Sequence, residues 1–271
     1  MRTMEPRRAA LVTAATVGVI TLGGVAVAAP ASATGLSPEP GPVENVPGFS
    51  VDWYLDVVTF ASLTPKWLQS FTAFFTSGAV VLLAVIMIVG WWLARRKDAH
   101  QVALSLLAPV GAGAAYLVSE TIKTFLATNR PCRTFRSIVT VAECPPMEDW
   151  TFPSNHATVA GAAAMGIFFF WRAMSVPAFF IAVSTAFSRV FIGVHYPHDV
   201  IVGFLIGCVV VSAVILMFEV RATRLVERLR PVPLLAPLLS AGGGGGKRRR
   251  GGSLEPSAQS QNTDRPPREW R

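Results

Sequence analysis

A polar stretch, SRVFIGVHYPHD at residues 188–199, lies between two apolar segments of this sequence. It carries Arg189, His195, His198 and Asp199, and groups of this kind are costly beside a membrane unless they have a function. Asp199 follows His195 by four residues, so one helical turn would bring the carboxylate to the imidazole. A carboxylate in that position fixes the imidazole tautomer and stabilises the protonated form, which makes His195 a candidate nucleophile.

Two more segments supply positive charge and hydrogen-bond donors. KTFLATNRP contributes Lys123 and Arg130, which together with Arg189 make three cations. The guanidinium fork of arginine matches phosphate oxygens. FPSNHAT opens an apolar segment, where the free N–H groups of a helix start would bind an anion, and its Ser154 hydroxyl is a further donor. His156 is then available to protonate a leaving oxygen, so the three segments predict phosphate chemistry.

A zinc site is the alternative use of the same side chains. His156, His195, His198 and Asp199 are all possible zinc ligands. The three cations close by would repel a divalent ion, and a Tyr-Pro pair separates His195 from His198. We therefore expect no bound metal, and we expect His198 to be a boundary residue without a catalytic role.

The composition predicts that membrane helices position these residues. Hydrophobic residues make up 52% of the 271-residue chain and charged residues only 15%, against roughly a quarter in soluble domains. The uncharged run at residues 77–94 is long enough for a helix to cross about 30 Å of hydrocarbon. We expect an all-α, polytopic membrane bundle of about six transmembrane helices, or five if the first is a cleaved signal. The expected spans are 9–29, 72–94, 102–122, 156–172, 175–192 and 199–218.

The chain is expected to divide into four parts. These are a signal peptide or first transmembrane helix at 1–34, an extracytoplasmic loop and interfacial segment at 35–71, a transmembrane core at 72–218, and a basic, Gly- and Pro-rich disordered tail at 219–271.

Positive charge predicts the orientation. Arg7, Arg8, residues 95–97, Arg172 and the basic tail fall on one side if the spans alternate, and that side should be cytoplasmic. The polar segments would then face outward. The formal net charge of +8 lies largely beside spans and in the tail, which argues against nucleic-acid binding.

Two of the three cysteines belong to the same outward segment. Cys132 and Cys144 would lie in an oxidising compartment, where a disulfide can persist. The sequence leaves open whether they are bridged or are two free thiols, because it does not give their geometry. Cys208 lies within a span and is expected to fill space there.

The three segments resemble the three-part signature of the type 2 phosphatidic acid phosphatase superfamily. The matching patterns are K-x6-RP (123–131), PS-x-H (153–156) and SR-x5-H-x3-D (188–199). The resemblance implies a bundle of six helices and no metal cofactor. It also implies that His195 attacks phosphorus, Asp199 orients it and His156 protonates the leaving group. The phosphoryl oxygens would then contact Lys123, Arg130, Ser154, Asn155, His156 and Arg189.

Asn155 departs from this pattern, since the family usually has glycine there. Glycine allows close backbone approach to a phosphate, whereas asparagine keeps the N–H and tolerates unusual backbone angles. The departure leaves the shape of the pocket and the substrate preference open.

The expected function is a membrane phosphatase acting at the outer face on a lipid phosphate or a polyprenyl diphosphate. Two alternatives are a vanadium-dependent haloperoxidase, which the family includes, and a non-catalytic binder or carrier of lipid phosphates. Membrane spans argue against the first, and binding alone would not need His156, His195 and Asp199. The sequence does not choose among phosphatidate, phosphatidylglycerophosphate and undecaprenyl diphosphate.

Overall fold

A computed structural model describes residues 46–240 of the chain, and this part is built from helices without strands. The expected all-α fold is therefore confirmed. The segment at 1–34, with its choice between signal peptide and first span, lies outside the described residues, as does the chain after residue 240. The helices are α1 (Gly48–Leu63), α2 (Lys66–Ala94), α3 (Ala99–Leu126), α4 (Pro131–Thr134), α5 (Asn155–Phe170), α6 (Arg172–Phe191), α7 (Pro197–Leu229) and α8 (Ala236–Leu239).

Four of the described helices, α2, α3, α6 and α7, are long and apolar enough to cross a membrane. Apolar side chains such as Ile88, Phe180 and Val209 are exposed on their outer surfaces. Exposed apolar surface of this extent suits contact with lipid rather than water. The chain is a multi-pass membrane protein, as the composition predicts.

Helix α5 has only 16 residues and packs against α2, α3, α6 and α7. Its small side chains allow this central position, because they let neighbouring backbones come close. A Cβ atom added at Gly207 of α7 would overlap the Thr158 backbone of α5, and one added at Gly161 would lie 2.5 Å from the Phe204 carbonyl oxygen. The start of α5, which belongs to FPSNHAT, is thereby fixed within the bundle.

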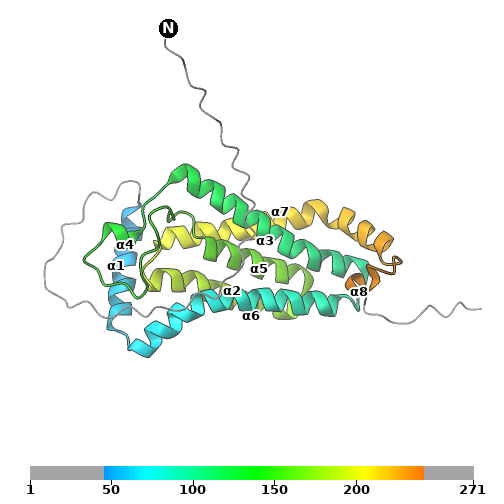
Figure 1. The fold of residues 1–271 in the computed structure, drawn as a ribbon, viewed down its shortest axis with the longest axis horizontal. Coiled ribbons are helices and arrows are strands. Elements are labelled where there is room, and N and C mark those ends of the chain that lie inside the picture. The colour runs from blue at the N-terminus through cyan, green and yellow to red at the C-terminus, as the bar shows by residue number, and fades with distance from the viewer. Residues whose placement is uncertain (1–45, 241–271) are drawn as a thin grey trace, which may run out of the picture.

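Helix α1 lies across one end of the bundle, beside α4, while α8 lies at the other end (Figure 1). The described part of the expected loop and interfacial segment at 35–71 consists mainly of helix α1 and the start of α2. Burial holds helix α1 in this position, because Tyr54 and Val58 pack with Val190 and Tyr196. The Tyr54 hydroxyl also donates to the Gly193 carbonyl (3.0 Å), so α1 braces the loop between α6 and α7.

The other end of the bundle differs from the expected disordered tail. Helix α7 continues to Leu229, well past the expected boundary at 218, and the chain then turns back. Val226 and Leu239 are buried against Val102 and its neighbours at the start of α3. Arg230 donates to the Lys97 carbonyl at 2.9 Å. Residues 219–240 are therefore packed structure, because apolar side chains among the arginines find partners there.

Candidate active site

The predicted polar residues converge at the end of the bundle that α1 covers. They come from the end of α3, the segment after it, the start of α5, the end of α6, the loop that follows and the first turn of α7. A pocket of about 280 Å³ brings six of the eight predicted site residues together, namely Lys123, Arg130, Asn155, His156, Arg189 and His195. Val80, Tyr116 and Val159 form an apolar side of this pocket. Ser154 and Asp199 lie behind it, fully buried.

His195 is held from behind by two oxygen atoms. Its Nδ1 lies 3.4 Å from Asp199 Oδ2 and 3.2 Å from the Thr151 hydroxyl. Thr151 donates to the same Asp199 oxygen at 2.5 Å, and the Tyr196 backbone N–H donates to it at 2.9 Å. The Thr151 hydroxyl uses its own proton in the bond to Asp199, so both oxygens beside Nδ1 accept hydrogen bonds and favour the tautomer with the proton on Nδ1.

The other ring nitrogen of His195 faces Arg130. Nε2 lies 3.2 Å from Arg130 Nη1, which donates to it. Burial, together with the positive charges of Arg130 and Arg189, holds the pKa of His195 well below its ordinary value. The imidazole is therefore neutral near pH 7 and carries a lone pair on Nε2, as a nucleophile requires.

Asp149 binds two of the three cations. Its carboxylate contacts Lys123 Nζ at 3.0 Å and Arg130 Nη2 at 2.8 Å, and its carbonyl accepts from Arg130 Nε at 2.9 Å. Burial alone would raise the pKa of Asp149, but Arg130 and Lys123 outweigh it and the pKa is lowered. Arg189 instead donates to the Thr76 hydroxyl at 3.4 Å.

The Asn155 side chain points to α3 and is held there. Ser119 donates to its Oδ1 at 2.6 Å, and its Nδ2 donates to Glu120 Oε1. The backbone N–H of the preceding Ser154 donates to the Asp199 carbonyl at 3.1 Å, which joins the starts of α5 and α7. Within the described part of the chain the Ser154 hydroxyl has no hydrogen-bond partner.

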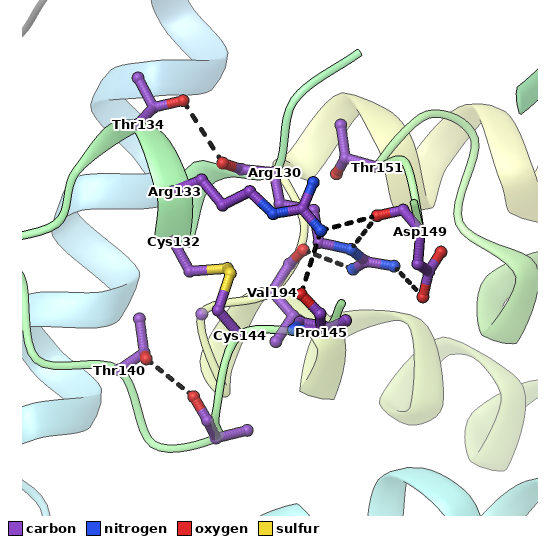
Figure 2. Close-up of a disulfide and its surroundings, with 12 residues drawn as sticks. Arg130, Cys132, Arg133, Thr134, Thr140, Cys144, Pro145, Asp149, Thr151 and Val194 are labelled. Atoms are coloured by element: carbon purple, nitrogen blue, oxygen red, sulfur yellow. Dashed lines mark hydrogen bonds and ion pairs between the residues drawn. A yellow bond between two sulfur atoms is a disulfide. The ribbon is translucent and has the colours of Figure 1, made fainter. Parts of the chain in front are cut away.

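A disulfide braces the segment that carries Asp149. Cys132 and Cys144 are bonded, with Cα atoms 5.8 Å apart. Figure 2 shows Arg133 beside this bond, reaching the carbonyls that lead to Asp149. Arg133 Nη2 donates to the Pro145 carbonyl (3.0 Å), to that of Pro146, and to that of Asp149 (3.3 Å). The Asp149 carbonyl thus accepts hydrogen bonds from both Arg130 and Arg133, which fix the backbone at this residue.

His198, expected to be a boundary residue, connects α1 to the site. Its Nδ1 lies 2.8 Å from the Ser50 hydroxyl, and its Nε2 lies 3.2 Å from Asp199 Oδ1. The ring makes stacked contacts with Phe152 and with Tyr196. It does not line the pocket, so its contacts support Asp199 rather than a ligand.

Sequence reasoning missed Asp149 and Thr151. Both lie in EDWTFPSNH, directly before the predicted anion-binding segment. An acidic side chain next to a predicted phosphate site was the only available signal for Asp149. No signal in the sequence pointed to Thr151, because a threonine shortly before a proline is ordinary in a loop.

Fold and site together define a multi-pass membrane protein with a cationic, histidine-containing pocket at one end of its helical bundle. Residues 103–222 match the family model of the PAP2 superfamily. The type 2 phosphatidic acid phosphatase resemblance of the three motifs is thereby confirmed.

The chain is also similar to characterised proteins. The chain is 28% identical to undecaprenyl-diphosphatase BcrC of Bacillus subtilis over 154 residues, which is 56% of this chain and 75% of that protein. It is 36% identical to decaprenylphosphoryl-5-phosphoribose phosphatase of Mycobacterium tuberculosis over 106 residues, or 39% of this chain and 56% of that protein. The crystal structure of a PAP2-type phosphatidylglycerolphosphate phosphatase from Bacillus subtilis matches with a TM-score of 0.49 and 21% identity. That match covers 64% of this chain and 88% of the other.

Proposed function

We propose that this PAP2-superfamily membrane protein is a phosphatase for lipid phosphates, acting on a phosphate monoester or a polyprenyl diphosphate. The observation that carries the proposal is the placement of His195, with a carboxylate behind Nδ1 and cations in front of Nε2. The two relatives named above, an undecaprenyl-diphosphatase and a decaprenylphosphoryl-5-phosphoribose phosphatase, support a polyprenyl substrate.

The first step forms a phosphohistidine. His195 Nε2 forms a bond to phosphorus while the bond from phosphorus to the leaving oxygen breaks. His156, which lines the same pocket, gives its proton to that oxygen. Asp199 and Thr151 stabilise the charge that develops on the imidazole, because both oxygens accept a hydrogen bond from Nδ1–H.

The second step regenerates the protein. A water molecule attacks phosphorus, His156 takes a proton from that water, and the phosphorus–nitrogen bond breaks. Inorganic phosphate leaves and His195 returns to its neutral form. The charge on the phosphoryl oxygens in both steps would be balanced by Lys123, Arg130 and Arg189.

The start of α5 would bind the same oxygens. The backbone N–H groups of Asn155 and His156 lie in the first turn of the helix, where they have no intrahelical acceptor. The buried Ser154 hydroxyl is a further donor for a phosphoryl oxygen.

We place the site at the outer face of a plasma membrane, with the C-terminal tail in the cytoplasm. The basic residues Arg95, Arg96, Lys97 and Arg172 gather at the bundle end opposite to His195, in keeping with the positive-inside rule. The apolar side of the pocket, at Val80 and Val159, suits the first carbons of a lipid chain.

Phosphate release by the purified protein in detergent, with EDTA present, tests the function. The panel should contain undecaprenyl diphosphate, phosphatidate and phosphatidylglycerophosphate, compared by kcat/KM. We expect release from at least one, and a loss of at least 10³-fold in kcat for His195→Ala. Wild-type turnover in that variant would refute the phosphohistidine, and lipid binding without any turnover in folded wild-type protein would favour a carrier.

A further inference from the structure

Asp149 contacts two cations that the proposed reaction needs for the phosphoryl group. Lys123 and Arg130 are buried, and each has a carboxylate oxygen of Asp149 within 3.0 Å. Figure 2 shows the Arg130 guanidinium directed at the Asp149 carboxylate. A phosphoryl group that binds both cations must therefore displace this carboxylate.

We propose that Asp149 determines which phosphate groups enter the site, by competing for Lys123 and Arg130 as an anion tethered to the pocket. In this role it admits phosphate monoesters and diphosphates and excludes the phosphodiester headgroups of bulk phospholipids. The inference rests on the proposed function and adds a specificity-determining residue to it.

Charge explains the discrimination. A carboxylate and a phosphodiester each carry one negative charge, so exchanging one for the other between two cations gains little Coulomb energy. A phosphate monoester carries about −1.5 to −2 near pH 7, and it gains from the exchange. The carboxylate also has the advantage of its attachment, since a tethered group acts at an effective concentration in the millimolar range.

A membrane phosphatase has a particular need for such a residue. Lipid phosphodiesters surround it at high local concentration, and a pocket with three free cations would bind them without reaction. Two of those cations, Lys123 and Arg130, are satisfied by Asp149 whenever no stronger anion is present. Arg189 remains for the incoming group.

The Asp149 carboxylate can move away from Lys123 and Arg130 while the loop stays folded. The Asp149 side chain is 45% exposed, so it can turn to water, whereas Lys123 is only 6% exposed and stays. The backbone of Asp149 is fixed by Arg133 and by the segment that follows Cys144. A rotation of the side chain alone would therefore release the cations and keep the loop in place.

A purely structural ion pair is the competing explanation. It predicts that loss of the Asp149 charge lowers the melting temperature but leaves ligand selectivity unchanged. The specificity role predicts a changed response to phosphodiesters, which stability does not affect. The two can be separated with Asp149→Asn, which keeps the size of the side chain.

The test uses the full chain in dodecyl maltoside micelles with phosphatidate as the substrate and phosphatidylglycerol as the phosphodiester. We expect phosphatidylglycerol to inhibit Asp149→Asn at a mole fraction about tenfold lower than it inhibits the wild type, which corresponds to about 1.4 kcal/mol. Glu143→Gln, which removes an exposed carboxylate from the same loop, should behave like the wild type. Equal inhibition of Asp149→Asn and wild type would overturn the proposal.

A second measurement needs no turnover. The thermal midpoint of each protein is recorded with inorganic phosphate and with dimethyl phosphate, a soluble diester. We expect phosphate to stabilise both proteins and dimethyl phosphate to stabilise only Asp149→Asn, or Asp149→Ser if the first variant is poorly folded. Stabilisation of the wild type by both anions would overturn the proposal. If this selectivity is seen in a wild type that hydrolyses no lipid, the proposed function fails and the role of Asp149 stands.

Discussion

Thr151 and Asp199 are joined by a hydrogen bond of 2.5 Å that is fully buried directly behind His195. The direct distance from His195 Nδ1 to the carboxylate, 3.4 Å, is longer than its distance to the threonine hydroxyl, 3.2 Å. The imidazole is thus oriented by a carboxylate and a hydroxyl acting together. The four-residue spacing of His195 and Asp199 in the sequence indicates the carboxylate but not the hydroxyl.

Thr151→Val tests this positioning role. Valine keeps the shape but removes the hydroxyl, which leaves Asp199 with one donor fewer and His195 with only the longer contact. We expect kcat to fall about 10- to 100-fold with KM nearly unchanged, because Thr151 does not line the pocket. Thr151→Ser, which retains the hydroxyl, should recover most of the activity. Equal loss in both variants would show that packing, not the hydroxyl, matters.

The loss of hydrolysis rate in His156→Ala should depend on the leaving group of the substrate. A general acid contributes about 10²- to 10⁴-fold when the leaving oxygen is strongly basic, as in a lipid alcohol. p-Nitrophenyl phosphate has a leaving oxygen that needs little protonation, so its hydrolysis should lose much less in the first step. Burst kinetics with this substrate would show the phosphohistidine accumulating in the variant. The same loss with both substrates would assign His156 to binding instead.

The free energy of unfolding should decrease as the pH falls, and His195 should contribute to this decrease. Its pKa is lowered in the folded state, so below about pH 6.5 the unfolded chain binds a proton that the folded chain does not. The contribution of this histidine is fully present above pH 6.5, and it is lost with a slope of up to about 1.4 kcal/mol per pH unit as the pH drops. Denaturant unfolding between pH 5 and pH 8 measures this slope. This slope should be smaller in His195→Gln than in the wild type. The control variant His100→Gln, which changes an exposed histidine at the opposite end of the bundle, should keep the wild-type slope.

Asn155→Gly addresses the departure from the usual family pattern. The asparagine side chain is directed to Ser119 and Glu120, and the backbone N–H is present in either residue. We expect kcat to change less than about threefold and the melting temperature to fall, since two hydrogen bonds between α3 and α5 are lost. A large gain in activity would instead mean that the asparagine obstructs the phosphate.

The sequence reveals the spans and the three polar segments because both depend on local patterns. Uncharged runs mark α2 and α7, and each motif is a short stretch of sequence beside the start or the end of a helix. Asp149 and Thr151 escape such reasoning, since they lie in a loop without periodicity and their partners are 19 to 48 residues away. The end of α7 was misjudged for a similar reason. Its arginines look like a solvated tail, while the burial of Val226 against α3 depends on how the chain turns back.

The contact between Arg130 Nη1 and His195 Nε2 has one more consequence. A lone pair that accepts from a guanidinium cannot attack phosphorus at the same time. In the proposed reaction Arg130 would turn toward an arriving phosphoryl oxygen, and this one movement would both free the Nε2 lone pair of His195 and bring positive charge to the group to be attacked. Recognition of the substrate and activation of the histidine would then be a single event, which protects a reactive nitrogen from everything else that passes along the membrane surface.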